Sequence, residues 1–287
     1  MHERTLPTRN PGGAGARRAS PPPARSATDR IAQPVKENSM NSSKHTRTAV
    51  VTGASSGIGY GIAEAFLKQG ANVVMNARNE TKLVAAAKKL GAPERIAVVA
   101  GDIGSADTAR RIVNTAKERF DGLDVLVNNA GIFASRPIAE YSESDLDGYL
   151  NFLKGTFLLT QAAVEPMRNC GGGAVINITT ILAFRGVRSV PASAPMAGKG
   201  GIQALTQTLA IELAPDNIRV NAIAPGLIRT PIYGKSDEEF AELNGMQPLG
   251  RVGEVSDIVD AALYLAEAGF VTGVVLPVDG GIAAGGE

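Results

Sequence analysis

The chain is predicted to form an α/β domain built on a doubly wound parallel sheet. Apolar runs of strand length alternate along the sequence with longer amphipathic runs of helical length, which is the pattern of repeated βα units. Most of the short runs are continuous in Val, Ile and Ala, as is typical of parallel strands buried on both faces. Because βα units connect by right-handed crossovers, helices are expected on both faces of the sheet.

The elements follow from these patterns in chain order, and they show no fixed-period repeat and no second domain. The expected strands are 48–52, 72–76, 95–100, 123–127, 173–178, 218–223 and 273–276. The expected helices are 58–69, 79–90, 105–119, 143–168, 196–214 and 254–267. Residues 47–287 are therefore interpreted as one domain.

The first 46 residues differ in composition from the rest of the chain. They hold six of the 16 prolines, much Arg and Ser, and almost no aliphatic periodicity, so we expect residues 1–46 to be a disordered tail. An Arg-rich transit peptide is the alternative, but no amphipathic face is visible. A solvated tail is favoured, with Met40 as a candidate start.

Composition excludes several classes of function. The net charge is +1, and residues 47–287 hold 21 Lys/Arg and 25 Asp/Glu, which does not favour nucleic acid as a partner. No uncharged apolar run is long enough to cross a membrane. The single cysteine, Cys170, fits a reducing compartment, so a cytoplasmic location is expected. Both histidines, His2 and His45, precede the first strand, which removes Ser-His-Asp catalysis and His-ligated zinc, and no metal is expected.

A glycine-rich turn, TGASSGIG at 52–59, joins the first strand to the first helix. Gly53 permits a tight turn, Gly57 lets a pyrophosphate approach the backbone, and Gly59 lets the helix pack closely on the strand. The free N–H groups and the positive dipole end of the helix favour an anion. An ordinary glycine-rich loop is the alternative interpretation.

Further polar residues follow the carboxyl ends of other strands, where open α/β sheets bind ligands. Arg78 stands where an acidic residue would bind a ribose 2′-hydroxyl, and its guanidinium can pair with a 2′-phosphate. NADP(H) is therefore expected in preference to NAD(H), the alternative being a solvated Arg at a helix start. Asp102 and Ile103 follow the third strand, where an adenine could lie, although Asp102 could instead cap a helix. The segment 128–131, NNAG, ends the fourth strand.

Together these segments resemble the short-chain dehydrogenase/reductase family, over roughly 47–283. The matching pieces are 52–59, 128–131, NITT at 177–180, Lys199, IRVN at 218–221, Pro225-Gly226 and VDGG at 278–281. The resemblance implies a Rossmann-type subunit of seven parallel strands, a nicotinamide cofactor, a small carbonyl or alcohol substrate, and assembly as a homotetramer or homodimer.

The resemblance also implies a set of cofactor contacts. It places Gly53, Ser55, Gly57, Ile58, Asp102, Asn129 and Lys199 on the cofactor, with Pro225, Gly226, Ile228 and Thr230 at the nicotinamide end. Their neighbours Ser56, Gly59, Ile103, Ala130 and Gly131 complete the expected cofactor site together with Arg78.

The chain departs from the family at the proton donor. The family requires a Tyr four residues before the Lys, and that position is Pro195, which has no side-chain proton. Proline is tolerated in a first helical turn, so the fold survives. Thr180 stands at the family's Ser position and keeps a hydroxyl that can bind a carbonyl oxygen.

A third catalytic position of the family, an Asn in the long helix, is also altered. Phe152 has the usual spacing, so either Asn151 takes the role from about 100° round the helix or the role is lost. Ser193 is interpreted as a helix N-cap rather than an acid. Tyr233, in the segment 227–250 that resembles the family's substrate lid, is expected to pack there but could swing toward the site. Tyr149 is expected in the core or an interface.

The sequence thus predicts an NADP(H)-dependent oxidoreductase that interconverts a carbonyl and an alcohol, similar to the 3-oxoacyl reductases of the family. Thr180 would orient the carbonyl oxygen, Lys199 would hold the ribose, and Asn151 is the third catalytic candidate. The alternative is a catalytically weak nucleotide-binding homologue that acts as a sensor or scaffold, which the missing Tyr favours.

Overall fold

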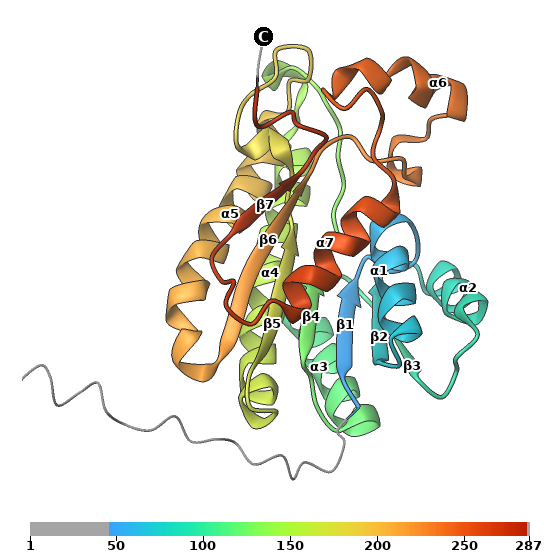
Figure 1. The fold of residues 1–287 in the computed structure, drawn as a ribbon, viewed down its shortest axis with the longest axis vertical. Coiled ribbons are helices and arrows are strands. Elements are labelled where there is room, and N and C mark those ends of the chain that lie inside the picture. Colours follow the sequence, from blue (N-terminus) through green and yellow to red (C-terminus); the bar gives the residue numbers. More distant parts are fainter. Residues whose placement is uncertain (1–45, 286–287) are drawn as a thin grey trace, which may run out of the picture. The chain divides into compact units, whose positions relative to one another are not determined.

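The computed structural model describes residues 46–285, so the predicted tail lies outside the described residues except for Thr46. Seven parallel strands form one sheet in the order β3-β2-β1-β4-β5-β6-β7 (Figure 1). The strands are β1 Thr48–Thr52, β2 Asn72–Ala77, β3 Ile96–Ala100, β4 Val125–Asn128, β5 Gly173–Ile178, β6 Ile218–Pro225 and β7 Val275–Val278. The doubly wound parallel sheet expected from the sequence is confirmed.

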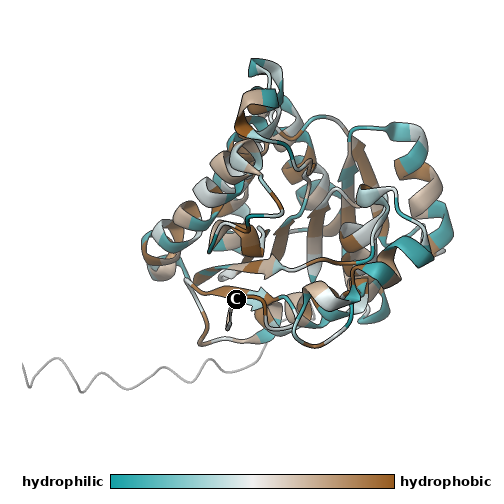
Figure 2. Ribbon diagram, turned by 90° about the horizontal axis from the view of Figure 1, so that it is seen from above, coloured by the Kyte–Doolittle hydropathy of each residue, from teal (hydrophilic) through white to brown (hydrophobic). Residues whose placement is uncertain are grey.

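Helices cover both faces of this sheet. They are α1 Gly57–Lys68, α2 Glu80–Leu90, α3 Ala106–Phe120, α4 Glu143–Asn169, α5 Ser193–Glu212, α6 Asp237–Glu242 and α7 Val255–Glu267. Alternate strand residues point into different cores, since Ala49 and Val51 pack with α1, α2 and α7, whereas Val50 packs with α3, α4 and α5. Figure 2 shows the apolar strands between the helices of the two faces.

The expected boundaries hold to within three residues, and the largest difference is informative. Helix α5 begins at Ser193 rather than at 196, and its N-cap is Ala192, which makes no side-chain cap bond. The interpretation of Ser193 as the N-cap is therefore wrong. Pro195 lies in the first turn, where backbone N–H groups have no intrahelical partner, so its missing N–H removes no helical hydrogen bond.

The segment 227–250 contains elements that were not expected from the sequence. The 3₁₀ turn η5 Pro231–Tyr233, the short helix α6 and the 3₁₀ turn η6 Asn244–Met246 follow the carboxyl end of β6. The Ser236 hydroxyl caps α6 by accepting a hydrogen bond from the Glu239 backbone N–H, and the Glu239 carboxylate accepts one from the Ser236 backbone N–H. No helix within residues 46–285 is long and apolar enough to span a membrane.

Candidate nucleotide-binding and active site

The glycine turn after β1 is built so closely that side chains are excluded from it. Gly53 and Gly57 have φ values of +65° and +56°, a region that favours glycine. A Cβ on Gly53 would lie 2.8 Å from Asn129 Nδ2, and one on Gly59 would lie 2.5 Å from the Gly53 carbonyl oxygen. Gly59 thus lets the helix approach the turn itself. Gly57 faces Thr230, and a Cβ built on Gly57 would lie 3.5 Å from the Thr230 Cβ.

Two side chains hold this turn against the end of β4. The Thr52 hydroxyl accepts hydrogen bonds from the backbone N–H groups of Asn129 and Ala130, both at 3.0 Å. The Asn129 amide donates to the Thr52 carbonyl at 2.8 Å. The sequence pointed to Asn129 but missed Thr52, because its partners lie 77 and 78 residues away along the chain.

The start of α1 has the features of an anion site. The first N–H groups of a helix have no intrahelical partner, and the first turn of α1 holds no acidic residue that would repel a phosphate. The N-cap Ser56 is extended and makes no cap bond, so its hydroxyl is available, and Ser55 beside it is half-buried. These residues fit the pyrophosphate of a dinucleotide.

Arg78 and Asp102 lie beyond the ends of β2 and β3, at the side of the glycine turn away from β4. Arg78 is exposed, and within residues 46–285 it makes no hydrogen bond or ion pair. Ile103 is buried, whereas Asp102 is exposed. Asp102 Oδ1 accepts hydrogen bonds from the Gly104 N–H and from Asn151 Nδ2, each at 2.9 Å.

Asn151 therefore lies elsewhere than expected for a catalytic residue. Its amide is bonded to Asp102 at the end of β3, and no hydrogen bond joins it to Thr180 or Lys199. Phe152, which has the family spacing, is buried. The displacement by one residue turns Asn151 toward β3, so the structure does not bring it together with the other two catalytic candidates.

Lys199 lies at the carboxyl end of β5, next to the loop that follows β4. Its Nζ donates a hydrogen bond to the Ile178 carbonyl oxygen at 2.5 Å, and a Cβ on Gly131 would lie 3.3 Å from that nitrogen. Burial lowers the pKa of Lys199 from 10.5 to about 8. The ammonium form still predominates at neutral pH, so the site carries a positive charge.

Thr180 follows β5 by two residues and is half-buried. Its hydroxyl accepts a hydrogen bond from the Leu182 N–H at 3.3 Å and retains its proton for a further acceptor. Pro195 is buried one helical turn before Lys199, where the family's phenol would stand. The site thus combines a hydroxyl and an ammonium without an aromatic acid on α5.

The two tyrosines considered as replacement acids are engaged elsewhere. The Tyr233 ring makes edge contacts with Phe133 and Phe240, at centroid distances of 6.3 and 6.2 Å. Burial raises its pKa, and no hydrogen bond joins it to Thr180 or Lys199. Tyr149 is buried on α4, where burial raises its pKa as well. Both phenols keep their protons at neutral pH.

A buried polar network fixes the strand ends next to Lys199. Asn128 donates to Asn177 at 2.9 Å and to Thr160 at 3.1 Å, and Asn177 donates to Thr206 at 2.9 Å. These four side chains tie β4 and β5 to α4 and α5, the helix that carries Lys199. The sequence marked both asparagines but missed both threonines, since helical threonines give no distinctive local signal.

The four residues expected at the nicotinamide end come from the end of β6 and the loop after it. A Cβ on Gly226, which follows Pro225, would lie 2.8 Å from Asp279 Cα, so glycine is required for β6 to pass this point. Thr230 faces the glycine turn, as noted above. Ile228 is 3% exposed and lines a separate pocket of about 300 Å³.

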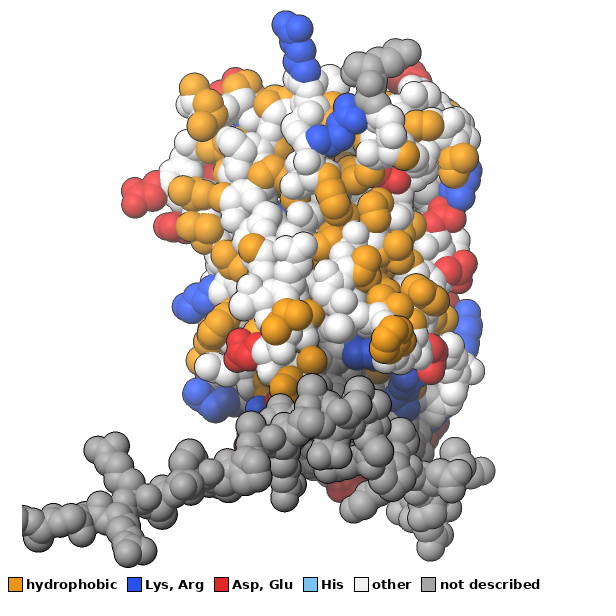
Figure 3. All heavy atoms as spheres, turned by 60° about the vertical axis from the view of Figure 1, so that its left-hand side comes forward, with side chains coloured by type: hydrophobic (Ala, Val, Ile, Leu, Met, Phe, Trp, Pro, Cys, Tyr) orange, Lys and Arg blue, Asp and Glu red, His pale blue; other side chains and the backbone are white. Residues whose placement is uncertain are grey.

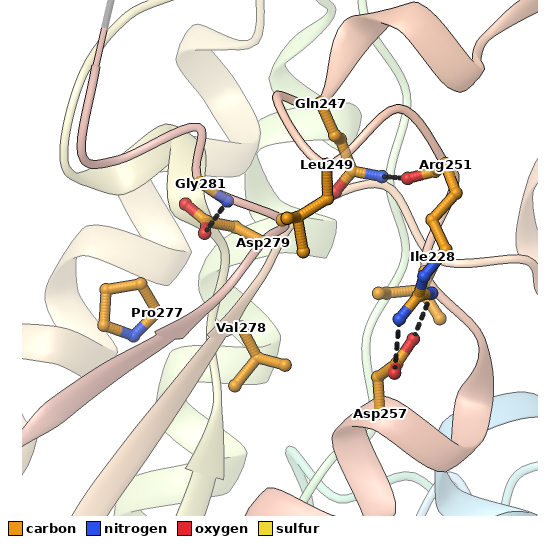
Figure 4. Close-up of a pocket in the computed structure, with 11 residues that line it drawn as sticks. Ile228, Gln247, Leu249, Arg251, Asp257, Pro277, Val278, Asp279 and Gly281 are labelled. Atoms are coloured by element: carbon orange, nitrogen blue, oxygen red, sulfur yellow. Dashed lines mark hydrogen bonds and ion pairs between the residues drawn. The ribbon is translucent and has the colours of Figure 1, made fainter.

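That pocket lies between the segment 227–250, the end of β7 and the start of α7 (Figure 4). Its polar side chains are already paired: Arg251 forms two bonds with Asp257, Gln247 donates to the Arg251 carbonyl, and Asp279 accepts from the Gly281 N–H. Neither Thr180 nor Lys199 lines it. The pocket therefore stands apart from the candidate catalytic groups.

No group of three or more His, Cys, Asp or Glu side chains in the described part of the chain could hold a metal ion.

Comparisons with known proteins agree with this architecture. A family model described as Enoyl-(Acyl carrier protein) reductase matches residues 53–283. The chain is 38% identical over 242 residues to the BbsD subunit of (2S)-[(R)-hydroxy(phenyl)methyl]succinyl-CoA dehydrogenase from Thauera aromatica, covering 82% of this chain and 96% of that one. It is 34% identical over 241 residues to the 3-oxoacyl-[acyl-carrier-protein] reductase of Thermotoga maritima, covering 82% and 97%.

Solved structures give the same result. A short-chain dehydrogenase/reductase from Brucella melitensis matches with a TM-score of 0.76 and 37% identity, over 82% of this chain and 96% of that one. L-sorbose reductase from Gluconobacter frateurii, complexed with NADPH and L-sorbose, matches with a TM-score of 0.76 and 30% identity, over 84% and 97%. Because the family model spans most of the sequence and these relatives cover more than four fifths of it, the chain belongs to the short-chain dehydrogenase/reductase family of oxidoreductases.

Proposed function

We propose that the protein is an NADP(H)-dependent oxidoreductase that interconverts a carbonyl and an alcohol. The observation that carries this proposal is that three features lie at the carboxyl ends of β1 and β5. These are the open N-terminus of α1, the Lys199 ammonium against Ile178, and the Thr180 hydroxyl two residues further on. The names of the relatives above, which are dehydrogenases and reductases, support the same reaction class.

The residues of the chain divide the work by position. The α1 N-terminus, with Ser55 and Ser56, would bind the pyrophosphate, and Arg78 would bind a 2′-phosphate. A bound nicotinamide supplies a hydride donor or acceptor. Thr180 would orient the substrate oxygen, and the Lys199 ammonium would hold a ribose hydroxyl and stabilise the negative charge that develops on that oxygen. The donor of the final proton is unassigned.

The cofactor preference is tested at Arg78. Because the guanidinium is free of protein partners in the described residues, Arg78→Ala should leave stability unchanged. The variant should weaken NADPH binding by about 1.5–3 kcal/mol, which is the free energy of one charge-assisted hydrogen bond, and leave NADH binding nearly unchanged. Titration of cofactor fluorescence measures both, with Arg110→Ala, a change of another exposed Arg on α3, as the control. Equal affinity of the unaltered protein for the two cofactors would refute the NADP(H) assignment.

One observation favours a second candidate function, a nucleotide-binding homologue with weak turnover that acts as a sensor or scaffold. Pro195 is buried where the family's proton donor would stand, and no phenol of the described residues is bonded to Thr180 or Lys199. The nucleotide-binding features fit both candidates. Measuring turnover with activated carbonyls distinguishes the two candidates, because a sensor or scaffold needs no catalytic turnover.

We also propose that the protein is a homodimer or homotetramer in the cytoplasm. Helices α4 and α5 keep apolar residues outside their own core, with Phe157 48% and Ile211 78% exposed. Figure 3, which turns the α5 side of the molecule forward, has hydrophobic side chains along most of its height. Such a face is stabilised by burial against a second copy across a two-fold axis.

A further inference from the structure

The pocket between the segment 227–250, the end of β7 and the start of α7 has room for a small ligand. Its apolar lining comes from Ile228, Leu249, Pro277 and Val278, and its volume of about 300 Å³ is at the lower end of the range for small-molecule sites (Figure 4). Leu249 is 71% exposed, so it stands at the mouth of the pocket, whereas the buried Ile228 lies in its wall. The lining therefore suits the apolar body of a small molecule.

One buried oxygen of this lining has no hydrogen-bond donor. The Gln247 side chain is buried, and its Nε2 donates to the carbonyl oxygens of Leu227 at 3.1 Å and Arg251 at 2.9 Å. Because both partners are acceptors, the amide cannot be turned round, and the position of Oε1 is fixed. Oε1 lies beside the lining, since a Cβ on Gly280 would be 3.4 Å from it. Within residues 46–285 it accepts no hydrogen bond, and it is not fully enclosed, so a ligand N–H group can reach it.

The charged side chains of the lining leave an excess negative charge. Arg251 forms two hydrogen bonds with Asp257, at 2.7 and 2.9 Å, so these two charges balance. The Asp279 side chain is buried, and its carboxylate accepts hydrogen bonds from the backbone N–H groups of Gly281 and Ala283. No Lys or Arg of the part of the chain that the structure describes forms an ion pair with it. One guanidinium and two carboxylates therefore favour a cationic ligand over an anionic one.

We propose that this pocket binds a small organic ammonium ion with an apolar body. An ammonium N–H group donates to Gln247 Oε1, the Asp279 carboxylate supplies the balancing charge, and the apolar body is buried among the aliphatic side chains of the lining. An alcohol of similar shape offers one neutral donor, whereas a carboxylate offers none and is repelled. Because neither Thr180 nor Lys199 lines the pocket, the inference does not rest on the proposed reaction.

The test uses three probes of similar shape, which are cyclohexylammonium, cyclohexanol and cyclohexanecarboxylate. The full chain carries ¹³C-labelled isoleucine methyl groups, and NMR titrations are recorded near neutral pH without cofactor. The Ile228 methyl signal reports occupancy directly, because this side chain lines the pocket. Ile138, which is 77% exposed and lies outside the lining, shows whether a probe binds nonspecifically to apolar surface.

Two pairs of variants relate the signal to the pocket. Leu249→Trp narrows the mouth with a larger side chain, and Val84→Trp, at an exposed position of α2, is its control. Asp257→Asn removes one carboxylate and leaves the Arg251 charge unbalanced. Its control is Asp260→Asn, an exposed position of α7 outside the lining. Thermal unfolding without a probe checks that each variant is folded.

In the unaltered protein the Ile228 signal should shift with cyclohexylammonium at a dissociation constant of about 1 mM, as expected for so small a ligand. Cyclohexanol should bind about tenfold more weakly, because its hydrogen bond is not charge-assisted, and cyclohexanecarboxylate should not bind. Leu249→Trp should abolish the shift. Asp257→Asn should weaken cyclohexylammonium about tenfold and allow the carboxylate to bind, and both control variants should behave as the unaltered protein.

Equal affinities for cyclohexylammonium and cyclohexanol would show that the pocket recognises shape alone, and would overturn the inference. A shift of Ile228 that both Leu249→Trp and Asp257→Asn leave unchanged would overturn it too, as would the absence of any shift with cyclohexylammonium. If one variant does not fold, the other pair and the three probes still decide. None of these results affects the proposed oxidoreductase function, which is tested by NADPH binding and turnover.

Discussion

The lowered pKa of Lys199 predicts how the stability of the protein depends on pH, and this can be measured without a substrate. Burial disfavours the ammonium form in the folded protein, whose pKa is about 8 against 10.5 for an unburied Lys. Between these values the unfolded chain binds more protons than the folded one, so stability increases as the pH rises from about 8 to 10.5. Below pH 8 both states are protonated and the full cost of burying the charge is present.

The magnitude follows from the shift. A difference of 2.5 pKa units corresponds to at most about 3.4 kcal/mol, of which roughly 2.5 kcal/mol should be recovered between pH 7 and pH 10. Lys199→Met removes the charge and the hydrogen bond to Ile178, but loss of that bond affects stability similarly at both pH values. Other groups titrate in both proteins, so their contributions cancel in the comparison.

The measurement is urea unfolding of both proteins at pH 7 and pH 10. The stability of the unaltered protein, measured relative to Lys199→Met, should rise by roughly 2.5 kcal/mol between the two pH values. A relative stability that does not change with pH would refute the reasoning, because it would mean that Lys199 remains hydrated in the folded state. The site would then lack the dry surroundings in which its charge acts strongly.

Two further predictions concern the N-terminal segment of the chain and the assembly of the protein. A chain shortened to begin at Met40 should keep its melting temperature and NADPH affinity, since the composition of the removed residues does not favour packing; a marked loss of either would contradict this. Light scattering at micromolar concentration should give a dimer or tetramer. Phe157→Glu places a charge in the exposed apolar face, so this variant should be shifted toward the monomer. A stable monomer of the unaltered protein would contradict the prediction.

The sheet could be predicted from the sequence because its strands are continuous apolar runs and its turns carry glycine. The run 48–52 and the glycines that follow it fix both a strand and a helix start from local chemistry alone. The start of α5 could not be placed correctly, because Pro195 is compatible with both a loop and a first helical turn, and packing decides between them.

The site residues that belong to a recognisable sequence motif could be predicted. The residues whose role depends on a partner far away along the chain could not. Lys199 and Thr180 were identified by their motifs, and the structure brings both to the end of β5. Asn151 was assigned by its proximity to a motif position, but a shift of one residue turns it to Asp102, 49 residues away. Thr52, which holds the loop after β4, was missed because only the folded chain brings its partners together.

We infer that the chain keeps the residues of a dinucleotide site but has Pro195 where the family has its proton donor. Hydride transfer to a carbonyl leaves an oxygen that must be protonated, and a positioned acid contributes about 10²–10⁴-fold in rate. We expect the unaltered protein to bind NADPH tightly but to reduce simple ketones and aldehydes slowly, and Pro195→Tyr to accelerate the reaction. The variant should fold because position 195 lies in the first turn of α5.

The most direct measurement is stopped-flow oxidation of bound NADPH by a panel of activated carbonyls, with the unaltered protein compared with Pro195→Tyr. We expect slow oxidation in the unaltered protein and clearly faster oxidation in Pro195→Tyr, with similar NADPH affinity in both. If the unaltered protein turns over fast and Pro195→Tyr does not change the rate, the inference that the proton donor is missing is contradicted. Another group would then already supply the proton, and Tyr233 and Ser193 would be the first residues to replace.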